Sequence, residues 1–535
     1  MNWSFKQIIQ SCIDNRGYYY LKSSGHGLEK ESLRITPQGK LSQQAHPSNL
    51  GSALTHPHIS TDFSEAQLEL ITPYFPLEEK AISFLENLHL FIYPHLNEEM
   101  LWPFSTPCFL PNEKNIPLAY YGNSRDGIKK NIYRQGLSFR YGKSIQMLSG
   151  IHYNFSFSKD FLHFLHEQFN TNLSKQAFIS QAYLSLIRNF LRMNWINTYF
   201  FGASPVVDES YLNHPNNLLK KIDSHSYYGE HATSIRLSDL GYYSKVQTQI
   251  AISYNKLSSY IQDLSQAISN VNPQYQKIKL YNEGKYQQLN SFYLQNESEH
   301  YSLIRPKPQV QKGESILHAL QERGISYVEV RTIDLNPFNK NGIELDQLLF
   351  LHIFMVYCLF KESPPLSKPE QKILTENQNK VALFGRKPQI HLHHEKKGSI
   401  NMKHWAENIL NEMNEIAILM DKNHSNNQYS KSIEKRRQQL NNPALIPSNI
   451  FLENLKNYKG NLQKFGLNLA KNHKNLLSKN LLSAPIKQHL TKLSKLSIQE
   501  EKTLSTQDNY VPKDYENIQP SNQKLRREAQ LPSTH

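Results

Sequence analysis

The residues with the clearest chemical potential are carboxylates that alternate with other side chains along one short segment. In Gly27-Leu-Glu-Lys-Glu-Ser-Leu-Arg34, Glu29 and Glu31 are two positions apart. Successive side chains of a β-strand point to opposite faces, so a strand here places both carboxylates on one face, roughly 7 Å apart. Two buried like charges are costly unless a cation joins them. The spacing therefore predicts a cation site on this face.

Three further segments repeat the pattern of one packed face and one polar face. In residues 149–157, apolar side chains alternate with His152 and Asn154. Residues 66–72 and 325–337 also alternate, and their polar positions are Gln67, Glu69, Tyr327, Glu329 and Arg331. Asp62 lies shortly before the segment 66–72. One such strand alone is more often a solvated face or an ion pair. Four of them lining a common surface offer several hard oxygen ligands and one imidazole.

This ligand set suits Mg²⁺, with Mn²⁺ as an alternative, better than it suits zinc. Mg²⁺ binds carboxylate oxygens, keeps several waters and usually brings nucleotide phosphates with it, whereas zinc prefers a tighter nitrogen and sulfur set. The sequence has no GxxxxGK[ST] loop and no GxGxxG loop, which excludes the phosphate-binding loops of P-loop enzymes and kinases. If ATP binds, we expect metal ions to hold most of its phosphate charge.

Arginine and tyrosine residues could complete such a site. Arg331 shares the face of Glu329 and could neutralise charge that builds on the γ-phosphoryl oxygens during transfer. Arg236 lies in the polar stretch 232–242 and suits bidentate capture of a carboxylate. Tyr242 and Tyr301 offer hydroxyl donors at the rim of a pocket. From the pattern alone, packing in surface loops explains Arg236 and the two tyrosines equally well.

Helical periodicity separates these strands. It predicts helices over residues 77–100, 129–141, 177–201, 244–268 and 345–360, and amphipathic helices after 386. Helices between strands could indicate a parallel sheet, but alternating faces are typical of an antiparallel one. We predict an α+β fold in which helices cover the outer face of a curved antiparallel sheet and the inner face forms a polar funnel. Residues 1–385 would form the catalytic domain, 386–500 a helical region packed on it, and 501–535 a flexible polar tail.

Composition limits the partners. The 535 residues carry a net charge of +14, prominent in the C-terminal third, and a lysine-rich surface explains it better than nucleic-acid binding because no basic platform interleaved with aromatics is present. Cys12, Cys108 and Cys358 form no CxxC pair, which favours a reducing compartment. The N-terminus lacks a signal-peptide core, and the apolar run 348–360 is too short to span a bilayer. We expect a cytoplasmic monomer that binds neither nucleic acid nor membrane.

Over roughly residues 25–340 the sequence resembles the γ-proteobacterial type of glutamate–cysteine ligase, the first enzyme of glutathione synthesis. The resemblance rests on segment 27–34 and on blocks at 50–56, 61–63, 133–134, 149–156, 201–205, 232–242, 304–307 and 327–338, with weaker matches at 385–388 and 441–443. Lys30 and Ser32 stand where the family motif has Arg and Thr. Both point away from the predicted metal face, so the chemistry should be kept.

The resemblance implies a glutamine synthetase-like fold with a six-stranded antiparallel sheet. It implies Mg²⁺-dependent joining of the γ-carboxylate of L-glutamate to the amine of L-cysteine, with ATP going to ADP and phosphate through γ-glutamyl phosphate. By family analogy the metal ligands are Glu29, Glu31, Asp62, Glu69, His152 and Glu329. Glu329 and Arg331 would be catalytic, Arg236 would hold a substrate carboxylate, and the cysteine pocket would be shaped by Tyr133, Leu137, Gln146, Tyr242 and Tyr301. Arg134 and Asn154 are further candidates.

Three alternatives stay open. A ligase of the same fold could join glutamate to a different amine, which would need another pocket around Tyr242 and Tyr301. A metal-dependent phosphotransferase would stop at a phosphorylated product. A basic nucleic-acid-binding protein would show salt-sensitive binding to RNA or DNA.

Overall fold

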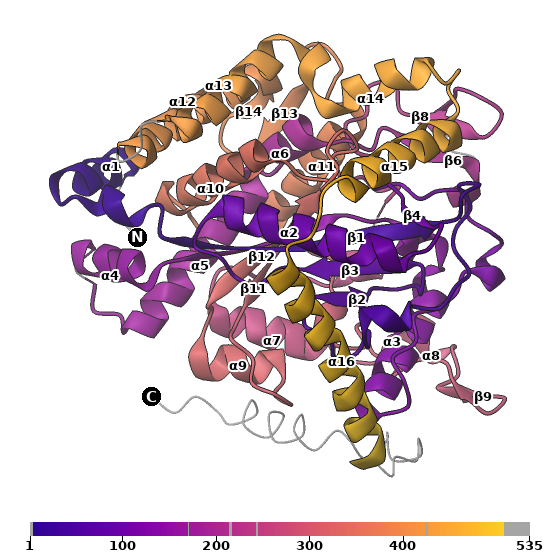
Figure 1. Ribbon diagram of the computed structural model, residues 1–535. Helices are drawn as coiled ribbons and strands as arrows, with labels where there is room; N and C mark the ends of the chain where they lie inside the picture. The colour runs from indigo at the N-terminus through magenta and orange to yellow at the C-terminus, as the bar shows by residue number, and fades with distance from the viewer. Residues whose placement is uncertain are drawn as a thin grey trace.

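One antiparallel sheet forms the centre of the protein (Figure 1). The computed structural model describes residues 4–169, 171–212, 217–241, 244, 246–422 and 426–507. Six strands follow the order β11-β12-β5-β1-β3-β2, and the short β4 pairs with β1 beside this path. Their bounds are β1 Ser24–Ile35, β2 Ile59–Thr61, β3 Gln67–Ile71, β4 Met100–Leu101, β5 Ile151–Phe157, β11 Ile304–Lys307 and β12 Tyr327–Ile333. The sheet is open, with β2 and β11 at its edges.

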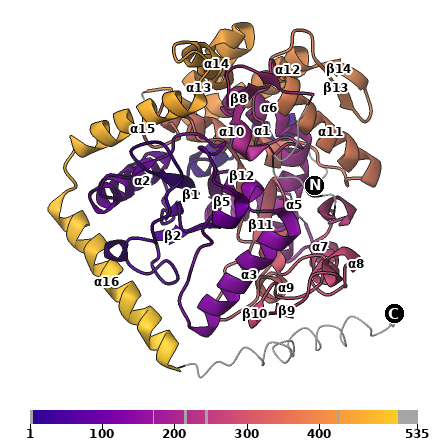
Figure 2. The same cartoon turned by 90° about the vertical axis from the view of Figure 1, so that its right-hand side faces the viewer.

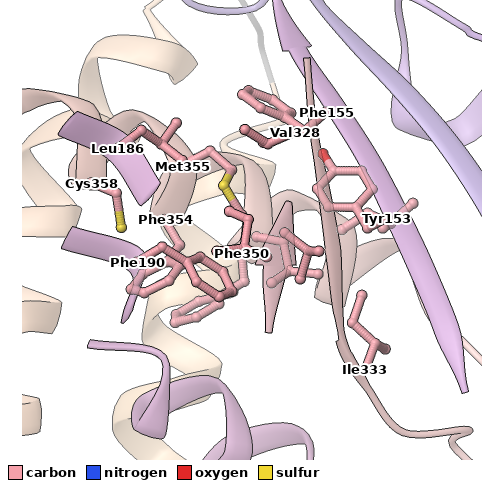
Figure 3. Close-up of a cluster of buried hydrophobic side chains, with 14 of the residues drawn as sticks. Tyr153, Phe155, Leu186, Phe190, Val328, Ile333, Phe350, Phe354, Met355 and Cys358 are labelled. Atoms are coloured by element: carbon pink, nitrogen blue, oxygen red, sulfur yellow. The ribbon is translucent and has the colours of Figure 1, made fainter. Parts of the chain in front are cut away.

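The outer face of the sheet packs on two helices, α5 (Lys175–Met193) and α10 (Leu345–Phe360). Tyr153, Phe155 and Val328 are fully buried and point toward these helices (Figure 3). α10 is buried almost all round, as expected for a helix between a sheet and a second layer of helices. The predicted α+β fold, with its antiparallel sheet and helix-covered outer face, is confirmed.

A hydrogen-bonded polar cluster fixes β1 to the outer layer. His352 of α10 bonds Glu78 through Nδ1 (2.7 Å) and Ser24 of β1 through Nε2 (2.9 Å). The Nδ1 atom of His26 lies 2.7 Å from the hydroxyl of Tyr153 on β5. Glu78 stands in the first turn of α2 (Glu78–Ile92), where the helix dipole favours a carboxylate. These bonds tie α2 and α10 to the back of the strand that carries Glu29 and Glu31.

Three predicted helices differ in extent. The helix predicted over 77–100 is α2, which ends at Ile92. The helix predicted over 177–201 is interrupted at Asn194, whose buried side chain bonds Gln378 and Thr332, and α6 (Trp195–Phe201) follows. The helix predicted over 244–268 is only α7 (Leu257–Ala267). The remaining helices before residue 386 are α1 Phe5–Asp14, α3 Arg125–Tyr141, α4 Lys159–Gln168, α8 Pro273–Gln276, α9 Ile316–Arg323 and α11 Lys368–Phe384.

The C-terminal part is mainly helical. Its helices are α12 Met402–Asp421, α13 Gln428–Asn441, α14 Pro447–Lys456, α15 Leu462–Ser478 and α16 Ala484–Gln507, preceded by the hairpin β13 His391–His394 and β14 Gly398–Asn401. Small antiparallel pieces elsewhere are β6 Val206–Asp208, β7 Lys220–Lys221, β8 Ser226–Tyr228, β9 Tyr281–Asn282 and β10 Lys285–Tyr286. The division of the chain at residue 385 stays a prediction. Of the predicted tail, residues 501–507 end α16, and the rest lies outside the described residues.

Helix α16 runs along the β2 side of the sheet (Figure 2). Ser497 accepts a hydrogen bond from the Ser52 amide at 3.0 Å, and its carbonyl accepts one from Thr55 at 2.6 Å. Both partners belong to the loop that leads into β2. None of the helices within the described residues is both long and apolar enough to cross a membrane.

Candidate active site

Strand register brings the predicted metal ligands together on the inner face. In the strand register, Glu29 of β1 lies opposite His152 of β5, and Glu31 of β1 lies opposite Glu69 of β3. Glu329 of β12 lies opposite Asn154 of β5. The period-two argument therefore holds for four strands at once, and residues far apart in sequence share one surface.

His152 lies at the middle of this surface. Its Nδ1 is 3.1 Å from Glu29 Oε2 and 3.9 Å from Glu329 Oε1, and its Nε2 is 3.6 Å from Glu31 Oε1. Asn154 donates to Glu29 Oε1 at 2.7 Å, which fixes the second oxygen of that carboxylate. The Gly150 amide donates to Glu31 Oε2 at 3.0 Å.

The carboxylates differ strongly in their affinity for protons. Burial, reinforced by Asp62, raises the pKa of Glu31 to about 7. Burial and the neighbouring Glu29, Asp62 and Glu31 raise the pKa of Glu69 well above its usual range. A like-charge cluster in a poorly solvated place retains protons because the charged forms repel each other. A divalent cation among these oxygens would replace the protons and remove the repulsion.

The residues present fit such an ion. Oxygen and nitrogen atoms of Glu29, Glu69 and His152 all lie within 4.8 Å of one another. Carboxylates dominate the set, as hard cations such as Mg²⁺ prefer. Asp62 is half-buried beside β2. Arg134, predicted as a further candidate, donates to the main-chain carbonyl of Asp62 and stacks over Tyr121 at 4.3 Å.

Basic residues occupy the β11–β12 side of the same face. Burial acts to raise the pKa of Glu329, but Lys307, Arg305 and Arg331 outweigh it and hold that pKa well below the usual range. Lys307 Nζ is 2.8 Å from Glu329 Oε2, Arg331 Nε is 3.4 Å from Oε1, and Arg305 Nη1 is 3.8 Å from Oε1. The basic side of the face thus favours the ionised form of Glu329, whereas the acidic side favours the protonated form of Glu69.

A small cavity of about 100 Å³ adjoins these groups and is lined by Glu31, His152, Arg331, Arg236 and Tyr301. Its arginines, together with Tyr301, make it suited to a small acid.

Arg236 is almost fully buried at this cavity. It donates to the carbonyls of Arg331 (3.1 Å) and Ile333 (3.4 Å) and pairs with Asp334 at 3.4 Å. A Cβ at position 150 would lie 2.0 Å from its Nη2 atom, so Gly150 is required for this close approach. The structure therefore places Arg236 beside β12, in a built position and not in a loosely packed surface loop.

The described residues predicted to shape the cysteine pocket lie on α3, on the turn that follows it and in the loop before β11. Gln146 donates to the Tyr301 hydroxyl at 2.8 Å. Leu137 is buried and Tyr133 packs beside it in the same apolar cluster. Tyr242 lies outside the described residues. Nearby, Glu299 ends a short 3-10 turn and pairs with Arg140 at 3.1 Å.

A second, larger cavity of about 870 Å³ opens at the other end of the inner face. Gly27, Asn154 and Ser156 line it from β1 and β5, Tyr327 from β12, and Tyr74 from the segment after β3. Small side chains on the two central strands leave this space open. The acidic cluster thus has a large cavity on one side and the small, arginine-lined cavity on the other.

Sequence reasoning missed three residues of the site. Arg305 and Lys307 alternate on β11, so the same period-two argument could have placed them beside Glu329. Asp334, which also accepts from the Ala203 amide and the Ser204 hydroxyl, follows β12 and carries no signal of this kind.

Known proteins show the same sequence pattern and architecture. A family model described as glutamate-cysteine ligase matches residues 9–381. The glutamate–cysteine ligase of Alcanivorax borkumensis is 42% identical over 475 residues, 88% of this chain and 90% of that protein. The one from Pseudomonas entomophila is 38% identical over 488 residues, 91% and 92% of the two chains. A crystal structure of glutamate–cysteine ligase from Francisella tularensis in complex with AMP is 34% identical, with a TM-score of 0.88 over 95% of this chain and 98% of that one. The chain belongs to the glutamate–cysteine ligase family.

Proposed function

We propose that the protein joins the γ-carboxylate of L-glutamate to the amine of L-cysteine, consuming ATP and releasing ADP and phosphate. The observation that carries the proposal is the convergence of Glu29, Glu31, Glu69, His152 and Glu329 between two cavities of unequal size. The family supports the same reaction, because the relatives bear the name of this ligase.

The two cavities suggest how the substrates are arranged. The larger one has room for a nucleoside and borders the carboxylate-bearing strands at Asn154. The crystal structure with AMP shows that one relative binds an adenine nucleotide. The smaller cavity has Arg236 and Arg331 in its wall and suits the amino acid. The triphosphate would then cross the acidic cluster, with its γ-phosphoryl group next to the glutamate γ-carboxylate.

Mg²⁺ is the cation we propose for this cluster, held by Glu29, Glu31, Asp62, Glu69, His152 and Glu329. When bound it screens the triphosphate charge and favours attack on the γ-phosphorus. Mn²⁺ would serve the same ligands.

The protein's own groups act on both halves of the reaction. A carboxylate is a poor electrophile, so ATP first converts the glutamate γ-carboxylate into an acyl phosphate. Arg331 neutralises the negative charge on the transferred phosphoryl group. Arg236 holds the substrate carboxylate and orients it. The cysteine amine then attacks the acyl carbon and phosphate leaves, while Tyr133, Leu137, Gln146 and Tyr301 shape the acceptor pocket and limit hydrolysis.

The test is Glu329→Gln, with Glu376→Gln as the matched control, because Glu376 lies on the exposed face of α11. Gln keeps the shape of Glu329 but removes the negative charge that would bind a metal ion and that pairs with Arg305, Lys307 and Arg331. We expect dipeptide formation to fall by at least ~10³-fold, with an unchanged far-ultraviolet circular dichroism spectrum, and the control to keep full activity. Full activity of Glu329→Gln would remove this residue from the site.

The acceptor is tested separately. ATP consumption with glutamate and a panel of amines, with mass analysis of the product, distinguishes cysteine from other acceptors. Preference for another amine would redirect the proposal to a ligase of the same fold, and a phosphorylated product without a peptide bond would indicate a phosphotransferase. The monomeric state and the cytoplasmic location stay predictions from the sequence.

A further inference from the structure

Acidic and basic side chains occupy different halves of the inner face of the sheet. Glu29, Glu31 and Glu69 lie on β1 and β3, whereas Arg305, Lys307 and Arg331 lie on β11 and β12. Three fixed cations therefore surround one carboxylate, Glu329, while the carboxylates of the acidic side repel one another. A chain of phosphates carrying divalent cations matches this division, because its cations face the acids and its oxygens face the bases.

The three bases are not equivalent. The side chain of Arg305 is 11% exposed, and its guanidinium donates to the main-chain carbonyls of Ser298 and His300. Arg331 lines the small cavity, at the end assigned to the amino acid. Lys307 lies opposite Tyr327 in the register of β11 and β12, and Tyr327 lines the large cavity.

Lys307 is thus placed between the large cavity and the acidic cluster. Its side chain is 23% exposed, and its ammonium group reaches Glu329 Oε2 at 2.8 Å. Gln309, two residues further along the same segment, also lines the large cavity. An ammonium group on a flexible stem can move to a new oxygen partner without moving the strand.

We propose that Lys307 is a phosphate-binding residue that contacts the part of the triphosphate between the nucleoside and the transferred γ-phosphoryl group. This inference rests on the proposed function, because it requires ATP to cross the acidic cluster. It assigns successive phosphates to different bases: Lys307 to the β-phosphate, which AMP lacks, and Arg331 to the γ-phosphate. Glu329 holds the ammonium group until the nucleotide arrives and, when it binds a metal, releases it.

The experiment compares nucleotides of different length. Dissociation constants of AMP, ADP and a non-hydrolysable ATP analogue are measured in Mg²⁺ buffer by isothermal titration calorimetry for wild type, Lys307→Met and Lys307→Arg. Met keeps the length of the stem and removes the charge. The matched control is Lys312→Met, because Lys312 is 84% exposed on the same segment and pairs with Glu500.

A charge-assisted bond to phosphate is worth roughly 10- to 100-fold in affinity. We expect Lys307→Met to weaken ADP and the ATP analogue by at least ~10-fold and AMP by much less, Lys307→Arg to restore part of the loss, and Lys312→Met to behave as wild type. Melting temperatures without ligand verify that the variants fold.

Two outcomes would overturn the inference. An equal loss for all three nucleotides would mean that Lys307 only supports the shape of the site through Glu329, and no loss would mean that it does not contact phosphate. The proposed function fails differently: wild-type protein would then bind the ATP analogue no better than AMP, or form no dipeptide.

Discussion

Replacing Glu31 by Gln should stabilise the protein in the absence of metal ions and weaken its response to them. Glu31 is 4% exposed and lies among Asp62, Glu69 and the other acids of the cluster. Gln has nearly the same shape, and its oxygen can still accept the hydrogen bond from the Gly150 amide. The substitution therefore removes mainly the charge.

The pKa of Glu31 gives the magnitude and the sign. Burial and Asp62 raise it from 4.5 to about 7. The folded protein then holds a proton that the unfolded chain has lost, so this group lowers the free energy of unfolding as pH rises through that window. The full penalty above pH 7 is about 3 kcal/mol. Allowing for an imperfect fit of the Gln amide, Glu31→Gln should gain roughly 1 to 3 kcal/mol near pH 8.5. At about pH 5 the gain should fall below about 1 kcal/mol.

Urea unfolding with a metal chelator, at both pH values, measures this gain. Glu453→Gln is the control, because Glu453 pairs with Lys456 on the exposed face of α14 and such pairs contribute about 0 to 1 kcal/mol. Repeating the measurements in Mg²⁺ tests the predicted weaker response of the variant to metal ions, since a bound ion stabilises the fold by mass action. The wild type should gain more stability from Mg²⁺ than Glu31→Gln does. A variant less stable than wild type at about pH 8.5 without metal, or equally stabilised by Mg²⁺, would refute the reasoning.

Two further predictions concern the faces of the sheet. Burial lowers the pKa of Lys30 from 10.5 to about 7, so the wild-type protein gains stability as pH rises across that range. Lys30→Met should therefore be more stable than wild type by roughly 2 to 4 kcal/mol at pH 7, and this difference should shrink toward pH 10. Urea unfolding at both pH values measures the difference, and an unchanged or lower stability of the variant at pH 7 contradicts the prediction. Asp334→Asn should loosen Arg236, its partner at 3.4 Å, and raise the KM for glutamate about 10-fold, equivalent to about 1.4 kcal/mol, while the KM for ATP changes little. Steady-state kinetics with each substrate varied decide this, and equal changes in both KM values would assign Asp334 a general structural role.

The sequence predicted which side chains share the inner face better than it predicted the lengths of the elements. Glu29 and Glu31 could be assigned to one face because a strand has a period of two, whatever its neighbours are. Helix α10 could be predicted because its apolar residues run from Leu348 to Phe360 with His352 as the single polar interruption. The helix predicted over 177–201 failed at Asn194, whose side chain bonds residues distant in sequence.

The local sequence pattern also could not predict the order of the strands in the sheet. That β5 lies between β1 and β12 follows from tertiary packing, and this order is what brings His152 within 4 Å of Glu29, Glu31 and Glu329. Likewise, Asp334 is recognisable as the partner of Arg236 only once β12 and the loop at 232–241 are side by side.

The separation of acids and bases on the inner face has a physical consequence for metal binding. If the bases of β11 and β12 stood among Glu31 and Glu69, ion pairs would satisfy those carboxylates, and a metal ion would have to displace them. Placed on the far side, the bases pair with Glu329 and leave the acids of β1 and β3 repelling one another, so the metal-free fold is less stable than it could be. The free energy that this repulsion stores is released when a divalent cation binds, which increases the affinity of the site for it. Stability in the absence of metal and affinity for metal should therefore change in opposite directions when Glu31 or Glu69 is neutralised.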